Sequence, residues 1–123
     1  KYKILSLYKM TEFNLELSRA STAQITELLR REDLFECELT AFPHIGEANA
    51  DKLSDAGFNK ISQLVGKLLS YDNGVRTPQE VAQQFYTEDI EPTGMNKDKC
   101  QTLVYCCVHI ADEKKLFNFH GDN

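Results

Sequence analysis

The sequence predicts an all-α fold, a compact five-helix bundle that contains a helix-hairpin-helix motif. Apolar residues recur three or four positions apart through most of the chain after residue 20, which is the spacing of one helix face. A strong helix-start signal runs from Thr77 to Glu80, with an N-cap threonine, proline at the first helical position and glutamate at N3. Strand-like alternation is confined to short stretches at 2–8 and 12–17. Helices therefore dominate the predicted fold.

Local start and stop signals place the first two helices. Ser21 and Gln24 form a capping box before a helix expected over about 22–33. A second helix is expected over about 45–56, and Gly57 supplies the left-handed residue that ends it.

Single capping residues set the last three helices. Asn59 is the expected cap of a helix that ends near Leu69, Thr77 caps the fourth helix, and Asn96 caps a long final one. A loop that ends at Gly94 is expected between the fourth helix and the last. Helical spacing then predicts the buried residues of all five helices: Ile25, Leu28, Leu29, Ala50, Leu53, Ile61, Leu64, Val65, Leu68, Leu69, Val81, Ala82, Phe85, Cys100, Leu103, Val104, Cys107, Val108 and Ala111.

The 123 residues suit one domain, which we place at 20–123 after an N-terminal extension at 1–19 that is an arm or partly ordered. Hydrophobic residues make up 41% and charged residues 27%, as in globular proteins rather than disordered ones. The extension holds four of the 14 basic residues, so the domain has 10 basic and 17 acidic residues, a net charge of −7. This balance argues against nucleic-acid binding by bulk charge attraction, and it leaves open binding through a few well-placed groups.

The cysteines favour free thiols. Cys37, Cys100, Cys106 and Cys107 form no C-x-x-C pair, and three of them lie within one helical pattern. We therefore expect buried thiols in a reducing, intracellular compartment. Cys106 and His109 are three positions apart on one helix, but a second pair of ligands is missing from the pattern. We expect neither a metal nor a cofactor.

Catalysis and membrane insertion are not expected either. The sequence has no nucleophile motif and no phosphate loop of the nucleotide-binding kinds, so we expect no enzyme and no catalytic residues. Asp51 and Asp55 share one helix face, but such pairs are more typical of a solvated surface than of a catalytic site. No apolar stretch approaches the 18 or so residues of a membrane span, and residues 1–10 precede no small-residue cleavage site of a signal peptide.

Residues 43–58 carry the most specific functional signal. They have the form of a helix-hairpin-helix, a motif that we place at about 43–70. Gly46 would let the backbone approach a ligand closely, and the N-terminus of the following helix would attract phosphate. The small side chain of Ala48 keeps this approach open, and Lys52 would add one phosphate contact. The alternative is a tight turn between two helices that binds nothing.

The order of features from Leu39 to Phe117 resembles the barrier-to-autointegration factor family of small chromatin proteins. The resemblance lies in the run IGEANADKLSDAGFNK, the LVGKLL segment after it, and a Gly-Met-Asn-Lys segment that begins a cysteine-rich last helix. It implies a non-enzymatic, sequence-independent binder of double-stranded DNA. It also implies a homodimer that bridges two duplexes, docks LEM-domain proteins, and is found in the nucleus and cytoplasm.

The resemblance implies two DNA-facing segments. Hairpin residues would meet phosphates through backbone N–H groups, and the start of the last helix would complete the site. The implied DNA-binding residues are His44, Ile45, Gly46, Ala48, Asn49, Lys52, Asn96, Lys97 and Gln101.

Three positions in or next to these segments depart from the family pattern. His44 stands where the family has glycine, Asp51 where it has lysine, and Gln101 where it has arginine. Each change removes or opposes a phosphate contact. The departures leave an alternative function open, a dimeric protein-protein interaction or adaptor module that kept the fold and lost strong DNA binding.

Overall fold

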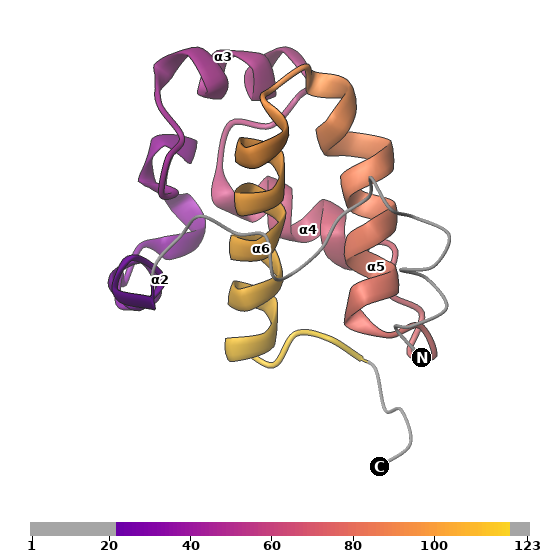
Figure 1. Cartoon of the computed structure of the whole chain (residues 1–123). Coiled ribbons are helices and arrows are strands. Elements are labelled where there is room, and N and C mark those ends of the chain that lie inside the picture. The colour runs from indigo at the N-terminus through magenta and orange to yellow at the C-terminus, as the bar shows by residue number, and fades with distance from the viewer. Residues whose placement is uncertain (1–21, 119–123) are drawn as a thin grey trace.

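The computed structural model describes residues 22–118, and over that range the chain forms five α-helices and no β-strand, which confirms the all-α prediction (Figure 1). The helices are α2 (Thr22–Leu29), α3 (Glu47–Asp55), α4 (Ile61–Leu69), α5 (Pro78–Phe85) and α6 (Lys97–Glu113). Single turns connect them: η2 (Leu34–Glu36) and η3 (Leu39–Ala41) after α2, and η4 (Tyr86–Ile90) and η5 (Glu91–Thr93) after α5. The predicted N-terminal extension, its two strand-like stretches and the cap at Ser21 lie outside the described residues.

Helix α6 is the central element, and α2, α4 and α5 pack around it (Figure 1). Ten of its 17 residues are buried, and they cover most of its circumference. A helix enclosed in this way needs residues without charge on nearly every side. The buried residues are Cys100, Gln101, Thr102, Leu103, Val104, Cys106, Cys107, Val108, Ile110 and Ala111. All six residues predicted for the buried face of this helix are among them.

The other helices each bury one face, as their spacing predicts. Their predicted core residues are buried except Leu29, Ala50 and Leu69, which are half-buried at the edge of the core. Each fully buried leucine or isoleucine stabilises the fold by about 1.5–3 kcal/mol, so this shared core holds the short helices together.

Two helix starts form as predicted, and one helix stop. The Thr77 hydroxyl accepts from the Glu80 N–H at 3.2 Å, and the Glu80 carboxylate accepts from the Thr77 N–H at 2.8 Å. The Asn96 side-chain oxygen accepts from the Asp98 N–H at 2.8 Å and caps α6. Gly57 follows α3 with a φ of +97°, the left-handed conformation expected of it.

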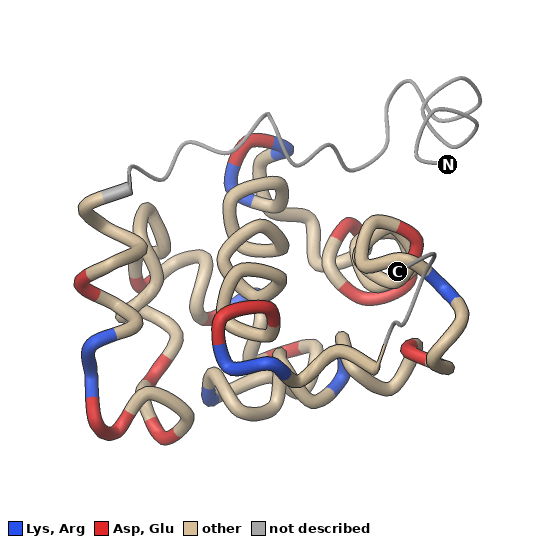
Figure 2. The backbone as a smooth tube through the Cα atoms, turned by 90° about the horizontal axis from the view of Figure 1, so that it is seen from below, with Lys and Arg blue, Asp and Glu red and all other residues tan. Residues whose placement is uncertain are grey.

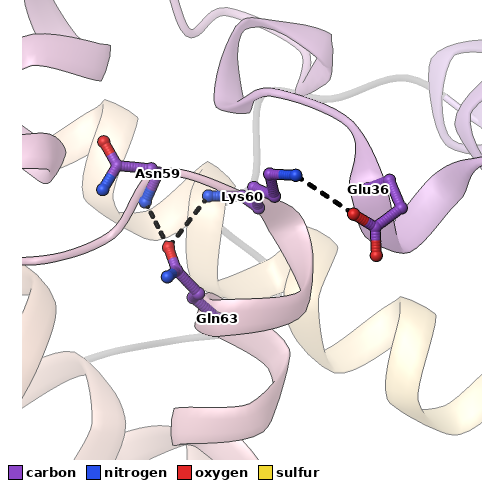
Figure 3. Close-up of polar contacts among 4 residues, drawn as sticks. All are labelled: Glu36, Asn59, Lys60 and Gln63. Atoms are coloured by element: carbon purple, nitrogen blue, oxygen red, sulfur yellow. Dashed lines mark hydrogen bonds and ion pairs between the residues drawn. The ribbon is translucent and has the colours of Figure 1, made fainter.

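The start of α4 differs from the prediction, because Asn59 is not its cap. The Asn59 side-chain oxygen accepts from the Ser54 hydroxyl at 2.7 Å and is therefore occupied. Gln63 takes over, and its side-chain oxygen accepts from the N–H groups of Asn59 (2.6 Å) and Lys60 (3.1 Å) (Figure 3). The Lys60 ammonium pairs with Glu36 at 3.1 Å and ties this helix start to η2.

Two segments differ in length from their predictions. Helix α2 ends at Leu29 rather than near residue 33, because the charged run at 30–33 has no apolar side chain to keep a further turn on the core. After α5, the chain continues through η4 and η5 where a loop was expected. Tyr86 and Ile90, four positions apart and both buried, draw this turn into the core.

Candidate nucleic-acid interface

The segment predicted to be the hairpin is a sharp turn between the three-residue 3-10 turn η3 and helix α3. His44 has a φ of +67°, in the left-handed region that glycine adopts most readily. The Ile45 N–H donates to the carbonyl of Phe42 at 3.3 Å. The Ala50 N–H donates to the carbonyl of Gly46 at 2.9 Å, within the first turn of α3. The turn therefore leads directly into the N-terminus of this helix.

The first turn of α3 has N–H groups that no carbonyl of the helix can accept from, those of Glu47, Ala48 and Asn49. Its N-cap is Gly46, which has no side chain to cap them. A Cβ atom at Gly46 would meet nothing within 4 Å, so the space beside the turn is open. An anion can approach these N–H groups, and the positive end of the helix dipole favours it.

A second segment lies beside α3, the helix that follows the predicted hairpin and is called the hairpin helix below. The Lys52 ammonium nitrogen lies 3.5 Å from the carbonyl oxygen of Gly94, in the chain between η5 and α6. Asn96 and Lys97 follow within three residues, and both are exposed. The fold therefore brings together the hairpin helix and the start of α6, the two segments that the sequence analysis assigned to one site (Figure 1).

Two of the nine predicted DNA-facing residues have buried side chains. Ile45 is 4% exposed and belongs to the core, so it offers the hairpin only its backbone. Gln101 is 1% exposed, and the prediction that its side chain meets DNA is wrong. The family resemblance assigned Gln101 to the site, but α6 is enclosed by its neighbours within one turn of its start. Of the other seven, Asn49 is half-buried and the rest are exposed: His44, Gly46, Ala48, Lys52, Asn96 and Lys97.

Helix α3 also carries an acidic stripe that the sequence analysis did not identify as a unit. Glu47, Asp51 and Asp55 are four positions apart and exposed, so they share one face of the helix. The spacing alone was the signal that could have found it. Elsewhere on the backbone, basic positions form short, separated segments rather than a continuous face (Figure 2). The site therefore combines helix N–H groups and two lysines with a neighbouring row of carboxylates.

The thiols lack the properties of catalytic nucleophiles. All four cysteines are free and buried, as predicted. Burial raises the pKa of Cys100 to about 11 and that of Cys106 to about 12, and it raises the pKa of Cys107 well above its ordinary value. Burial and the neighbouring Asp33 carboxylate also raise the pKa of Cys37. At neutral pH these groups are protonated thiols, whereas the thiolate is the reactive form.

Cys106 and His109, the pair with metal-ligand spacing, differ in their exposure to solvent. Cys106 is completely buried, while His109 is half-buried and lies against Tyr105, with 5.9 Å between the ring centroids. Within residues 22–118, no group of three or more His, Cys, Asp and Glu side chains is placed to hold a metal ion.

Two open hollows lie beside η3: one of about 230 Å³ between α2 and η3, and one of about 440 Å³ between η2 and η3. The larger one contains Asp33 and Glu36, whose carboxylates are paired with Arg31 at 3.4 Å and Lys60 at 3.1 Å. A hydrogen bond from the Cys37 thiol is the main cause that lowers the pKa of Asp33. Asp33 and Glu36 are therefore held as ion pairs at the edge of this hollow.

Comparisons with known proteins found no match: no family model, no curated protein and no solved structure. The family resemblance therefore depends on the sequence runs alone. Among the helices of the described range, none combines the length and the apolar character that crossing a bilayer requires.

Proposed function

We propose that this chain is a non-enzymatic protein that binds double-stranded DNA without sequence preference, as the barrier-to-autointegration factor family does. The observation that carries the proposal is the open first turn of α3, where three N–H groups lie behind an exposed Gly46 without a side-chain cap. Backbone N–H groups bind phosphate oxygens, which are the same at every base pair. Binding through them requires few cations, so it is compatible with an acidic domain.

The backbone at His44 supports this proposal. Its φ of +67° is typical of glycine, and the family has glycine at this position. The turn thus has the geometry that a glycine would give it, although the side chain is an imidazole. The Lys52 contact with Gly94 supports the same site, because it keeps the start of α6 beside the hairpin.

The proposal extends to bridging. A protein with one DNA site per protomer joins two duplexes when it dimerises, so we propose a homodimer as the working form. Further partners would be LEM-domain-like or other chromatin and nuclear-envelope proteins, and the site of action would be the nucleus and cytoplasm. These parts of the proposal follow from the family resemblance alone.

The proposal is tested by fluorescence anisotropy of labelled duplexes of unrelated sequence, titrated with the protein at several salt concentrations. Two or three neutralised phosphates predict an affinity loss of about 10- to 40-fold between 50 and 200 mM salt, equal for all sequences. A lack of binding even at low salt would exclude the phosphate clamp.

The acidic stripe favours a second candidate, a protein-interaction module that kept the fold and gave up DNA. Three exposed carboxylates on the helix that would face DNA repel phosphates and attract basic peptides. Isothermal titration calorimetry gives the affinity of the protein for a lysine-rich peptide and, separately, for a short DNA duplex. Comparing the two affinities distinguishes the two candidates. Stronger binding of the peptide would favour the interaction module.

A further inference from the structure

The acidic stripe lies on the outermost face of α3. Successive helix residues are about 100° apart, so Asp51 lies nearly opposite Leu53, two positions away. Leu53 is completely buried, and Asp51 therefore faces away from the core. Glu47 and Asp55 lie one turn before and one turn after Asp51, on the same ridge.

Lys52 lies on a different side of the same helix. It is one position from Leu53, so it occupies a flank of α3 about 100° from the core. The contact with the carbonyl oxygen of Gly94 shows which flank this is: the one facing the segment that starts α6. Lys97 is on that segment. Lys52 thus lies on the flank that faces the segment carrying Lys97, and the three carboxylates share the ridge beside that flank.

No counter-ion within the described range neutralises the ridge. The ion pairs of that range join Arg31 with Asp33 and Lys60 with Glu36, and the three stripe carboxylates take part in neither. Their charge is exposed to any polyanion that approaches the first turn of α3.

We infer that the acidic stripe is a repulsive specificity determinant. It confines a bound duplex to the flank of Lys52 and Lys97 and weakens the hold of the hairpin on DNA. This inference rests on the proposed function, because it concerns how the same site orients its ligand. The stripe makes affinity depend on the charge of one ridge, rather than on the net charge of the whole protein.

The test is the double substitution Asp51→Asn with Asp55→Asn, which removes two stripe charges and keeps the side chains polar and of equal size. Glu47 is left in place, because a carboxylate in the first turn stabilises the helix. The matched control is Asp112→Asn with Glu113→Gln, which also removes two charges. These residues lie at the far end of the 17-residue helix α6, about 24 Å from its start at Lys97. That separation exceeds the screening length of about 8–10 Å at 0.1–0.15 M salt.

Duplex affinity of the three proteins is measured by anisotropy at two ionic strengths, with helicity checked by circular dichroism. Neutralising the stripe should tighten binding by about three- to tenfold at low salt, less at high salt, and the control by less than twofold. An equal gain in both variants would overturn the inference and leave a bulk charge effect. So would an unchanged affinity in the stripe variant. Binding at low salt by the stripe variant but not by the wild type would support the inference and refute DNA binding as the function of the unmodified protein. Failure of all three proteins to bind would refute the proposed function and leave the hairpin without a phosphate site.

Discussion

The ammonium nitrogen of Lys52 lies 3.5 Å from the carbonyl oxygen of Gly94, which follows it by 42 residues. This contact joins the hairpin helix to the start of α6, and it uses only one of the three N–H donors of the lysine. The remaining two donors are available for phosphate. Lys52 therefore has both a positioning role and a charge to contribute.

Lys52→Ala should lower duplex affinity at low salt and reduce the salt slope by about one unit, as expected for the loss of a single phosphate contact. Lys114→Ala is the control, because Lys114 lies at the other end of α6 and is exposed. The slopes of log affinity against log salt give the comparison. Equal slopes for both variants would mean that Lys52 does not touch the DNA.

Gly46→Glu should abolish duplex binding while helicity and thermal stability stay close to those of the wild type. A Cβ atom at Gly46 meets nothing within 4 Å, and its φ of −98° suits any residue, so the fold tolerates the change. The new carboxylate would lie in front of the N–H groups that are proposed to hold phosphate.

The matched control for this change is Gly66→Glu. Gly66 is also exposed, and a Cβ atom there also meets nothing within 4 Å, but it lies on α4 rather than at the hairpin. The control adds the same charge and should keep most of the DNA affinity. Retained binding by the Gly46 variant would place the DNA site elsewhere on the surface.

Short-range signals made most of the helices predictable from the sequence. The cap at Thr77 and the stop at Gly57 depend on residues within three or four positions, and both form as predicted. The start of α4 depends on a contact beyond that range. Ser54, five residues before Asn59, occupies the side chain expected to cap the helix. Propensity alone could not show that this partner would compete.

The candidate site was only partly predictable for a similar reason. Helical spacing gives the buried face of a helix that packs on one side, but it does not show how many neighbours surround a helix. Gln101 has the polar side chain of a surface residue. It is nevertheless buried, because α6 is the central helix and neighbouring elements surround it. The contact between Lys52 and Gly94 joins segments 42 residues apart, and only the tertiary fold could bring them together.

The C-terminus of α6 offers a prediction about stability. Lys115 has a φ of +58°, at the position where helices commonly end with glycine. The Lys115 N–H donates to the carbonyl of Asp112 at 3.1 Å, and the Leu116 N–H donates to the carbonyl of Ala111 at 2.8 Å. These bonds hold a lysine in a conformation that costs it roughly 1–2 kcal/mol.

Lys115→Gly should therefore stabilise the protein by about 0.5–1 kcal/mol, since glycine adopts this conformation without the steric cost but loses more backbone freedom on folding. Lys114→Gly is the matched comparison, because Lys114 has a φ of −87° and gains nothing from glycine. Urea denaturation compares the two. If Lys115→Gly lowered the stability, the contacts of the lysine side chain would stabilise the fold by more than its left-handed backbone conformation destabilises it.

The buried thiols predict a loss of stability at alkaline pH. The pKa of Cys100 is raised to about 11 and that of Cys106 to about 12, from a reference value of 9.0, with burial as the main cause. In the unfolded chain these thiols ionise near pH 9, while in the folded protein they stay protonated. A pKa raised by folding gives stability that is complete below pH 9 and is lost as the pH rises toward the folded value.

We expect the free energy of unfolding to fall by about 1 kcal/mol per thiol for each pH unit above 9, as measured by urea denaturation between pH 7 and 10 in a reducing buffer. Cys106→Ala should lower the stability at pH 7, because it leaves a small cavity. It should also make the fall of the unfolding free energy above pH 9 less steep, because one thiol fewer ionises. The value at pH 7 reports the cavity, and the slope above pH 9 reports the ionisation. A stability that stays constant from pH 8 to 10 would mean that the thiols reach solvent and ionise while the protein is folded.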